Sequence, residues 1–255
     1  MSKAANTFKE ELDQVRLVVK KLLSNRESIK VLEVGCGSSS FIKLQQNTYM
    51  VGIDISEKQL QRNDILNEKI LGDIQTYNLP HSEFDLIVCW WVLEHLQYPE
   101  KALTNCLASL KENGIIVVAV PNVYSIKGLI TKYTPHQFHI WVYRYILGKK
   151  LAGIEDNPPF HTFLRFFIGL ESIKAFAYSN EFSVEYFGFH ESVDQKNFRE
   201  NHRIAGPAWS LVKLIIKVLS FGKVDAELTD LIVVLKNQKV VKDGAPARKL
   251  VKTIG

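Results

Sequence analysis

Residues 30–37, which read KVLEVGCG, decide how this chain folds. Residues 31–34 form a short apolar run, interrupted by one acid, that is typical of a buried strand. Gly35 and Gly37 follow at once, and a turn built from residues without a Cβ lets a ligand lie against the backbone. We expect the turn to lead into a helix whose first N–H groups face that ligand. The stretch therefore predicts a strand, a glycine turn and a helix with a binding site between them.

Five further apolar runs predict strands, at residues 49–53, 84–89, 114–120, 182–187 and 231–235. Residues 7–24 and the segment that starts at Pro99 carry apolar side chains at helical spacing. We expect a left-handed cap at Asn113 and Gly114 to end the second of these helices. Val- and Ile-rich runs that alternate with helices are typical of a mostly parallel sheet covered on both faces. The sequence therefore predicts an α/β fold.

Two segments do not fit this alternation. Residues 122–170 are rich in aromatic residues and histidine, and residues 190–228 separate two strands that could otherwise form a hairpin. Insertions near the carboxyl ends of strands shape the ligand site in open α/β sheets. We expect one domain over residues 1–236 with these two lid-like insertions, followed by a basic, flexible tail over residues 237–255.

The net charge of +5 is concentrated at the C-terminal end. Residues 236–255 contain six Lys or Arg residues and one Asp, so the rest of the chain is neutral. A neutral body argues against a nucleic-acid partner, whose binding face would be basic. The three cysteines show no paired or His-rich spacing, which argues against disulfides and a metal site. The polar N-terminus lacks the apolar core of a secretion signal, and no apolar run reaches about 18 residues, so we expect a cytoplasmic protein.

Asp54 ends the second predicted strand. It follows Gly37 at close to the spacing of roughly 20 residues at which a carboxylate binds the hydroxyls of a ribose. A dinucleotide-binding turn would need a glycine at position 40, where Ser40 stands. By themselves these residues indicate a nucleoside-like ligand without saying which one.

Four motifs carry a family resemblance: VLEVGCG at 31–37, VGIDIS at 51–56, GDI at 72–74 and FDLIVCWWVLEHL at 84–96. In order and spacing they resemble the motifs of class I S-adenosylmethionine-dependent methyltransferases, and residues 114–122 resemble the family's next strand. Ser39 stands where the family usually has a third glycine. The resemblance implies a Rossmann-like sheet of seven strands, one more than the apolar runs show, and S-adenosylmethionine as the cofactor. Residues 161–186 are similar to a subgroup of quinone, glycan-cluster and natural-product O-methyltransferases.

The resemblance also implies a role for each motif residue. Glu33 would bind the amino group of the cofactor's methionine part, Asp54 the ribose hydroxyls and Asp73 the adenine amino group. Ile55 would pack on the adenine, and Trp90 would line the methionine side. The full set of cofactor-binding residues that the resemblance implies is Glu33, Gly35, Cys36, Gly37, Asp54, Ile55, Asp73, Ile74, Cys89 and Trp90.

A hydroxyl acceptor must lose its proton, so a base is expected at the mouth of the site. The candidates are His95, His136, His139 and His161. His136 lies three residues before His139, so the two would share a helix face, and His139 is favoured as the base. The alternative is a structural role, with His95 bonded locally at a helix start and His161 lining the core.

The expected reaction is O-methylation of a small-molecule, glycan or lipid- or quinone-like hydroxyl by in-line methyl transfer. N-methylation of a small molecule is one alternative, and a nucleoside-binding or interaction module without catalysis is another. Residues 89–92 read CWWV in place of an amine-recognising tetrapeptide of the Asn-Pro-Pro-Tyr type. This difference argues against methylation of a nucleobase or of glutamine.

Residues 207–221 predict a helix whose only polar residues, Ser210, Lys213, Lys217 and Ser220, form one narrow stripe. The helix is too apolar for a free surface and too short to span a bilayer. We expect it to be buried under a lid or in a homodimer interface. The alternative is a peripheral membrane contact, in which the helix lies in the interface and both lysines reach the headgroups.

Overall fold

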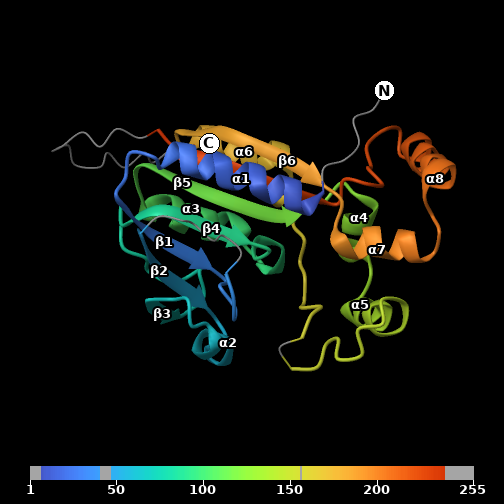
Figure 1. Cartoon of the computed structure of the whole chain (residues 1–255), viewed down its shortest axis with the longest axis horizontal. Helices are drawn as coiled ribbons and strands as arrows, with labels where there is room; N and C mark the ends of the chain where they lie inside the picture. Colours follow the sequence, from blue (N-terminus) through green and yellow to red (C-terminus); the bar gives the residue numbers. More distant parts are fainter. Residues whose placement is uncertain (1–6, 41–46, 156, 239–255) are drawn as a thin grey trace, which may run out of the picture.

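The computed structural model describes residues 7–40, 47–155 and 157–238. They form a seven-stranded sheet in the order β3-β2-β1-β4-β5-β7-β6, in which β7 is antiparallel to both neighbours and the other pairs are parallel. The strands are β1 (Ser28–Val34), β2 (Asn47–Asp54), β3 (Glu68–Leu71), β4 (Phe84–Trp90), β5 (Leu110–Pro121), β6 (Phe182–His190) and β7 (Asp230–Asn237). The predicted Rossmann-like, mostly parallel α/β sheet is confirmed (Figure 1).

The sheet lies between two apolar layers. Every residue of β4 is buried, and its side chains alternate, so that Val88 and Trp90 belong to one layer and Cys89 to the other. The helices that cover the sheet are α1 (Phe8–Leu22) and α2 (Glu57–Arg62) on the first face and α3 (Pro99–Ser109) and α6 (Leu170–Ser179) on the second. Both faces are therefore covered, as the continuous apolar runs require.

The predicted N-terminal helix is α1, and Thr7 with Glu10 forms a reciprocal capping box at its start. The predicted cap at Asn113 is wrong, because α3 ends at Ser109 and β5 begins at the next residue. Asn113 does have a left-handed φ of 56°, but it lies inside β5, where the pairing with β4 changes register. The helix predicted after the glycine turn falls on residues 41–46, which lie outside the described residues.

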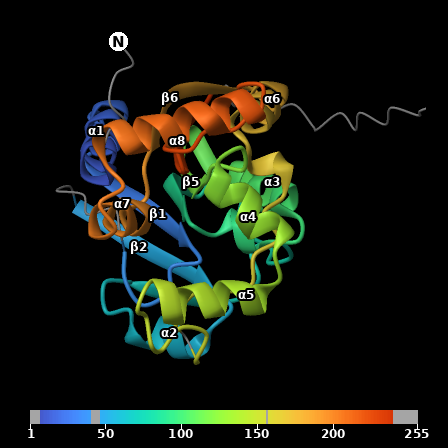
Figure 2. The same ribbon diagram turned by 90° about the vertical axis from the view of Figure 1, so that its right-hand side faces the viewer.

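Both predicted insertions contain helices. The helical elements are α4 (Ile126–Tyr133), α5 (His136–Trp141), a π-helical turn (Val142–Ile146) and a 3-10 turn (Phe166–Ile168) in the first, and α7 (Val193–Asn201) and α8 (Gly206–Leu219) in the second. In Figure 1, α4, α5, α7 and α8 gather at the right-hand end of the molecule, and Figure 2 shows this end face on. Among the described residues, no helix combines the length and hydropathy needed to cross a bilayer. The predicted basic tail lies outside the described residues from position 239 onward.

Candidate cofactor and acceptor site

The glycine turn follows β1 in a conformation that favours glycine. Gly35 has a φ of 59° and Gly37 a φ of 51°. A Cβ on Gly35 would lie 2.5 Å from Cγ2 of Val92, so the space beside the turn is too small for a side chain. The N–H of Gly35 donates to the carbonyl oxygen of Ile53 at 2.8 Å, which fixes the turn beside β2. The turn therefore forms a backbone cradle without side chains at Gly35 and Gly37, closely packed against its neighbours.

Asp54 closes the other side of this cradle. Its Oδ2 accepts from the N–H of Gly37 at 2.9 Å, and its Oδ1 accepts from the N–H of Ser56 at 2.8 Å. An ionised carboxylate has about four acceptor positions, so two remain for ligand hydroxyls. The two motifs that the sequence assigns to one ligand therefore meet at one place.

The segment after β3 forms the third edge. The N–H of Gly72 donates to the carbonyl oxygen of Asp54 at 3.0 Å. The Asp73 carboxylate accepts from the N–H of Gln75 at 2.9 Å and from its amide nitrogen at 3.1 Å, and Ile74 is buried beside it. Ile55 is 77% exposed at the end of β2. An exposed apolar side chain beside a carboxylate fits the stacking and polar edge that an adenine requires.

Burial limits how the side chains of the remaining predicted cofactor-binding residues can contact a ligand. Cys36 is buried, and burial raises the pKa of its thiol to about 12. Cys89 is also buried, and its thiol contacts Cys106 in the core, which raises its pKa well above the usual range. Glu33 is buried at the end of β1, opposite Gly52 of β2. Cys36 and Cys89 can therefore reach a ligand through their backbone, with their thiols held in the protein interior.

These residues fit S-adenosylmethionine. The cradle has no room for a Cβ at Gly35, and Asp54 offers free acceptor positions at its rim. A nucleoside along Asp54 and Asp73 would extend its methionine part past the turn toward Trp90, where β4 ends. The described residues of this arrangement can thus hold the cofactor.

A cavity of about 530 Å³ begins where β4 ends. Trp90 and Trp91 line it together with Phe8, which stacks on Trp91 at a ring distance of 5.8 Å. Trp91 has a φ of 55°, which is unusual for a bulky residue and is the kind of outlier that clusters at functional sites. Phe160 of the first insertion lines the same cavity, so its wall combines the sheet, the N-terminal helix and that insertion.

The structure brings the predicted histidines together from three separate segments. The rings of His136 and His139 on α5 lie 6.2 Å apart, and those of His136 and His161 lie 5.7 Å apart. His95, on the 3-10 turn Leu93–His95, joins them through the backbone of His161. His95 and His139 line the cavity, but His161 is not among the lining residues.

The two cavity histidines differ in the ring nitrogen that is left free. Nδ1 of His95 lies 2.7 Å from the carbonyl oxygen of His161. A carbonyl only accepts, so this Nδ1 carries the proton and Nε2 is left as the basic atom. For His139, Nε2 lies 2.7 Å from Oγ1 of Thr134, a hydroxyl that itself donates to the carbonyl of Ile130. Burial lowers the pKa of both rings, which keeps them neutral at pH 7.

Sequence reasoning missed the polar residues that share this cavity. Glu94 is 4% exposed and lines it, and burial raises the pKa of its carboxyl to about 8. His190 and Asp230 pair across β6 and β7, and Lys127 lies 3.5 Å from Asp230. Glu94 could have been predicted from the sequence, because it is adjacent to His95 in the motif at residues 84–96. The other three come from elements far apart in the chain, so only the sheet order brings them to one wall.

Residues 8–163 match the family described as "Methyltransferase domain". Among individual relatives, an uncharacterized protein of Methanocaldococcus jannaschii is 34% identical over 117 residues, covering 45% of this chain and 51% of the relative. The mitochondrial ubiquinone biosynthesis O-methyltransferase of Candida albicans is 30% identical over 128 residues, covering 45% and 39%. The chain thus spans about half or less of the length of these relatives.

Solved structures share the fold along almost the whole chain. The plantazolicin methyltransferase BpumL, in complex with a triazolic desmethylPZN analog and SAH, has a TM-score of 0.53 at 15% identity, and the match covers 91% of this chain and 86% of that chain. The [4+2]-cyclase SpnF also has a TM-score of 0.53 at 15% identity, over 92% and 84%. At this identity the likeness shows the fold alone. The family match, which spans the glycine turn, Asp54 and the end of β4, shows that this chain belongs to the S-adenosylmethionine-dependent methyltransferase family.

Proposed function

We propose that this protein transfers a methyl group to a hydroxyl oxygen of an aromatic or quinone-like small molecule held in the cavity. When bound, S-adenosylmethionine supplies an electrophilic methyl group on a positively charged sulfur. The observation that carries the proposal is the orientation of His95, whose Nε2 is left basic because Nδ1 donates to the carbonyl of His161. A hydroxyl needs such a base because its oxygen is a weak nucleophile until its proton is removed, whereas an amine in its neutral form attacks through its lone pair.

The backbone around His95 holds this orientation. The N–H groups of Phe163 and Leu164 donate to the carbonyl oxygen of Glu94 at 2.9 and 3.0 Å. These bonds fasten the end of the first insertion to the 3-10 turn and keep the His161 carbonyl beside the ring. The ring is thus positioned before any acceptor binds, which favours His95 over His139 as the base.

The cavity wall supports an aromatic acceptor. Trp90, Trp91 and Phe160 offer flat apolar faces, and aromatic pairs of this kind prefer stacked or edge-on contacts. Glu94, whose raised pKa leaves it protonated at pH 7, can donate a hydrogen bond to an oxygen of the acceptor. With the cofactor bound, the oxygen–methyl bond would form as the methyl–sulfur bond breaks to leave neutral S-adenosylhomocysteine, and the proton of the acceptor hydroxyl would pass to Nε2 of His95.

The names of the relatives support the same class of acceptor. The protein of Candida albicans is named a ubiquinone biosynthesis O-methyltransferase, and the match to it covers 45% of this chain. That name refers to transfer to oxygen, in agreement with a base beside the cavity. The acceptor of this chain is inferred from the cavity and from the relative together.

A methyl-transfer screen tests the proposal. Labelled S-adenosylmethionine is offered with phenols, catechols, quinone precursors, sugars and primary amines, and we expect label to appear on a phenolic or catechol oxygen. With the best acceptor, His95→Gln should lower kcat by a factor of about 10² to 10⁴ and leave the binding of S-adenosylhomocysteine unchanged. His139→Gln is the matched control and should have a smaller effect. Label on amines alone, or an unchanged kcat in His95→Gln, would refute the proposal.

A further inference from the structure

Helix α8 has its amphipathic sides reversed relative to an ordinary surface helix. Its polar side faces the protein, where Trp209 donates from its indole nitrogen to Glu227 at 3.2 Å and Lys213 donates to the same carboxylate at 3.0 Å. An ordinary surface helix turns its apolar stripe to the core and its charges to water. The anchoring of α8 through its charged side leaves its apolar side without a place in the core.

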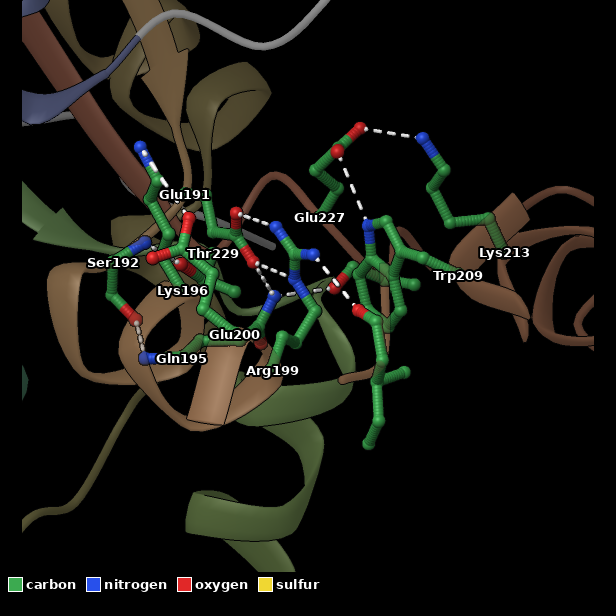
Figure 3. Close-up of polar contacts among 12 residues, drawn as sticks. Glu191, Ser192, Gln195, Lys196, Arg199, Glu200, Trp209, Lys213, Glu227 and Thr229 are labelled. Carbon is green, nitrogen blue, oxygen red and sulfur yellow. Dashed lines mark hydrogen bonds and ion pairs between the residues drawn. The ribbon is translucent and has the colours of Figure 1, made fainter. Parts of the chain in front are cut away.

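A clamp of polar contacts fixes this orientation. Arg199 of α7 makes two hydrogen bonds to Glu191, at 2.6 and 2.7 Å, and its guanidinium lies over the Trp209 ring at 4.5 Å. Figure 3 shows this chain of contacts from Glu191 through Arg199 and Trp209 to Glu227 and Lys213. Rotation of α8 to bury its apolar side would break the Lys213–Glu227 ion pair and would move the Trp209 ring away from Glu227 and from the Arg199 guanidinium.

The outer side of α8 is entirely apolar. It consists of Leu211, Leu214, Ile215, Val218 and Leu219, which are between 47% and 75% exposed. Phe221, just beyond the helix, is 90% exposed. The prediction that this helix is buried under a lid is therefore wrong within the chain itself. A continuous exposed apolar strip of this kind marks an interaction surface.

The charges beside the strip indicate what covers it. Lys217 and Lys223 flank Phe221, and Arg203 precedes the helix; all three are exposed, and none pairs with a carboxylate of the described residues. One face of a helix of 14 residues also offers a small contact area compared with the roughly 800 Å² that each partner buries in a stable protein interface. An apolar strip with unpaired cations at its rim is the pattern of a helix that lies in the headgroup region of an anionic bilayer.

We propose that α8 is a membrane-docking helix that seats the protein on an anionic lipid surface, with its outer side at the boundary between headgroups and acyl chains. The helix lies at the same end of the molecule as α4, α5 and α7 (Figure 2). Ser192, Val193 and Asp194, at the start of α7, line the acceptor cavity, so the clamp links the docking helix to the cavity wall. The inference does not rest on the acceptor being a hydroxyl.

Vesicle flotation with the full chain tests the proposal. We expect the protein to float with vesicles of equal parts phosphatidylcholine and phosphatidylglycerol, and to bind less well to phosphatidylcholine alone or in high salt. The double variant Leu214→Gln/Val218→Gln should lower partitioning onto the vesicles by a factor of more than about ten. Its melting temperature should stay the same, because both changes lie on an exposed face. Leu17→Gln is the matched control, because Leu17 is 60% exposed on α1, and it should float like the wild type.

Three results would overturn the proposal. The wild-type protein could stay in the soluble fraction with either kind of vesicle. The double variant could float as well as the wild type, which would assign binding to another part of the chain, such as the basic residues 239–255. Sedimentation could show a dimer that the double variant dissociates, which would make the outer side of α8 a contact between two copies. Methyl transfer is not measured in any of these experiments, so their outcome is separate from that of the proposed function.

Discussion

Oδ2 of Asp54 accepts a hydrogen bond of 2.9 Å from the backbone N–H of Gly37. One residue ends β2 and the other belongs to the turn after β1, so the bond joins the two halves of the cofactor cradle before any ligand is present. Hydrogen bonds to an ionised carboxylate are stronger than neutral ones, which makes this contact an effective brace for the turn. Asp54 therefore supports the loop, and its remaining acceptor positions would serve the ribose hydroxyls that the family resemblance assigns to it.

Replacement of Asp54 tests both parts. Asp54→Ala removes the acceptor for Gly37 and for ligand hydroxyls, so we expect the Kd of S-adenosylhomocysteine to rise by about 10- to 100-fold in titration calorimetry. Asp64→Ala, at an exposed aspartate ten residues later, is the control and should bind normally. Unchanged affinity in Asp54→Ala would show that the cofactor lies elsewhere.

The glycine turn can be tested by separating backbone strain from lack of space. Gly35→Ala introduces both backbone strain and a steric clash, since the φ of residue 35 is 59° and the new Cβ would lie 2.5 Å from Cγ2 of Val92. Gly148 has a φ of 70°, and no atom lies within 4 Å of the position that a Cβ would take. Gly148→Ala therefore introduces backbone strain without a steric clash. We expect denaturant unfolding to show a loss of about 1 kcal/mol for Gly148→Ala, and about 1–3 kcal/mol more for Gly35→Ala. Equal losses would mean that Val92 moves aside and that the turn is not closely packed.

Glu94 should make the stability of the protein depend on pH. Its carboxyl pKa rises from 4.5 in the unfolded chain to about 8 in the folded protein, so the folded state holds the proton more tightly between these values. The free energy of unfolding of the wild type should therefore fall as pH rises through this window. Glu94→Gln cannot lose a proton, so the wild type should lose on the order of a few kcal/mol relative to this variant between about pH 5 and about pH 8.

Urea denaturation at several pH values measures this difference. Glu112→Gln, at an exposed glutamate, is the control and should follow the wild type at every pH. If the stability curves of the wild type and Glu94→Gln run parallel across the whole range, Glu94 is charged in the folded protein and does not act as a hydrogen-bond donor to the acceptor.

The strands and the turn that carry the predicted cofactor-binding residues could be predicted because their signals are local. All six strands predicted from apolar runs are present, and the turn and its acid follow β1 and β2 directly. The seventh strand, β3, has no such signal because it is a four-residue edge strand with mostly exposed residues. The cavity residues His190 and Asp230 meet only because β7 inserts antiparallel between β5 and β6, which depends on the topology of the whole sheet.

The inward direction of Lys213 on α8 could not be predicted from the sequence, and Lys217 of the same stripe is exposed. Helical periodicity gave the stripe of Lys213 and Lys217 but not the direction in which it points. That direction depends on Glu227, in the connection after α8, and on Arg199, on another helix. Contacts between residues this far apart in the chain leave no periodic signal in the sequence. The exposure of the apolar side of α8 could therefore be found only from the structure.

The clamp that sets this direction is the last testable feature. Arg199 and Glu191 are 11% and 7% exposed, so removal of the guanidinium leaves a buried carboxylate without its main partner. We expect Arg199→Met to lower the free energy of unfolding by about 3–5 kcal/mol, and Glu191→Gln in the same chain to recover part of this loss. Lys58→Met is the control, because Lys58 and Glu155 form a pair that is 55% and 70% exposed, and it should change stability by less than about 1 kcal/mol. If Arg199→Met costs no more than the control, the Arg199 guanidinium does not brace α7 against the Trp209 ring of α8, and the outward direction of the apolar side must come from the contacts of Trp209 and Lys213 with Glu227 alone.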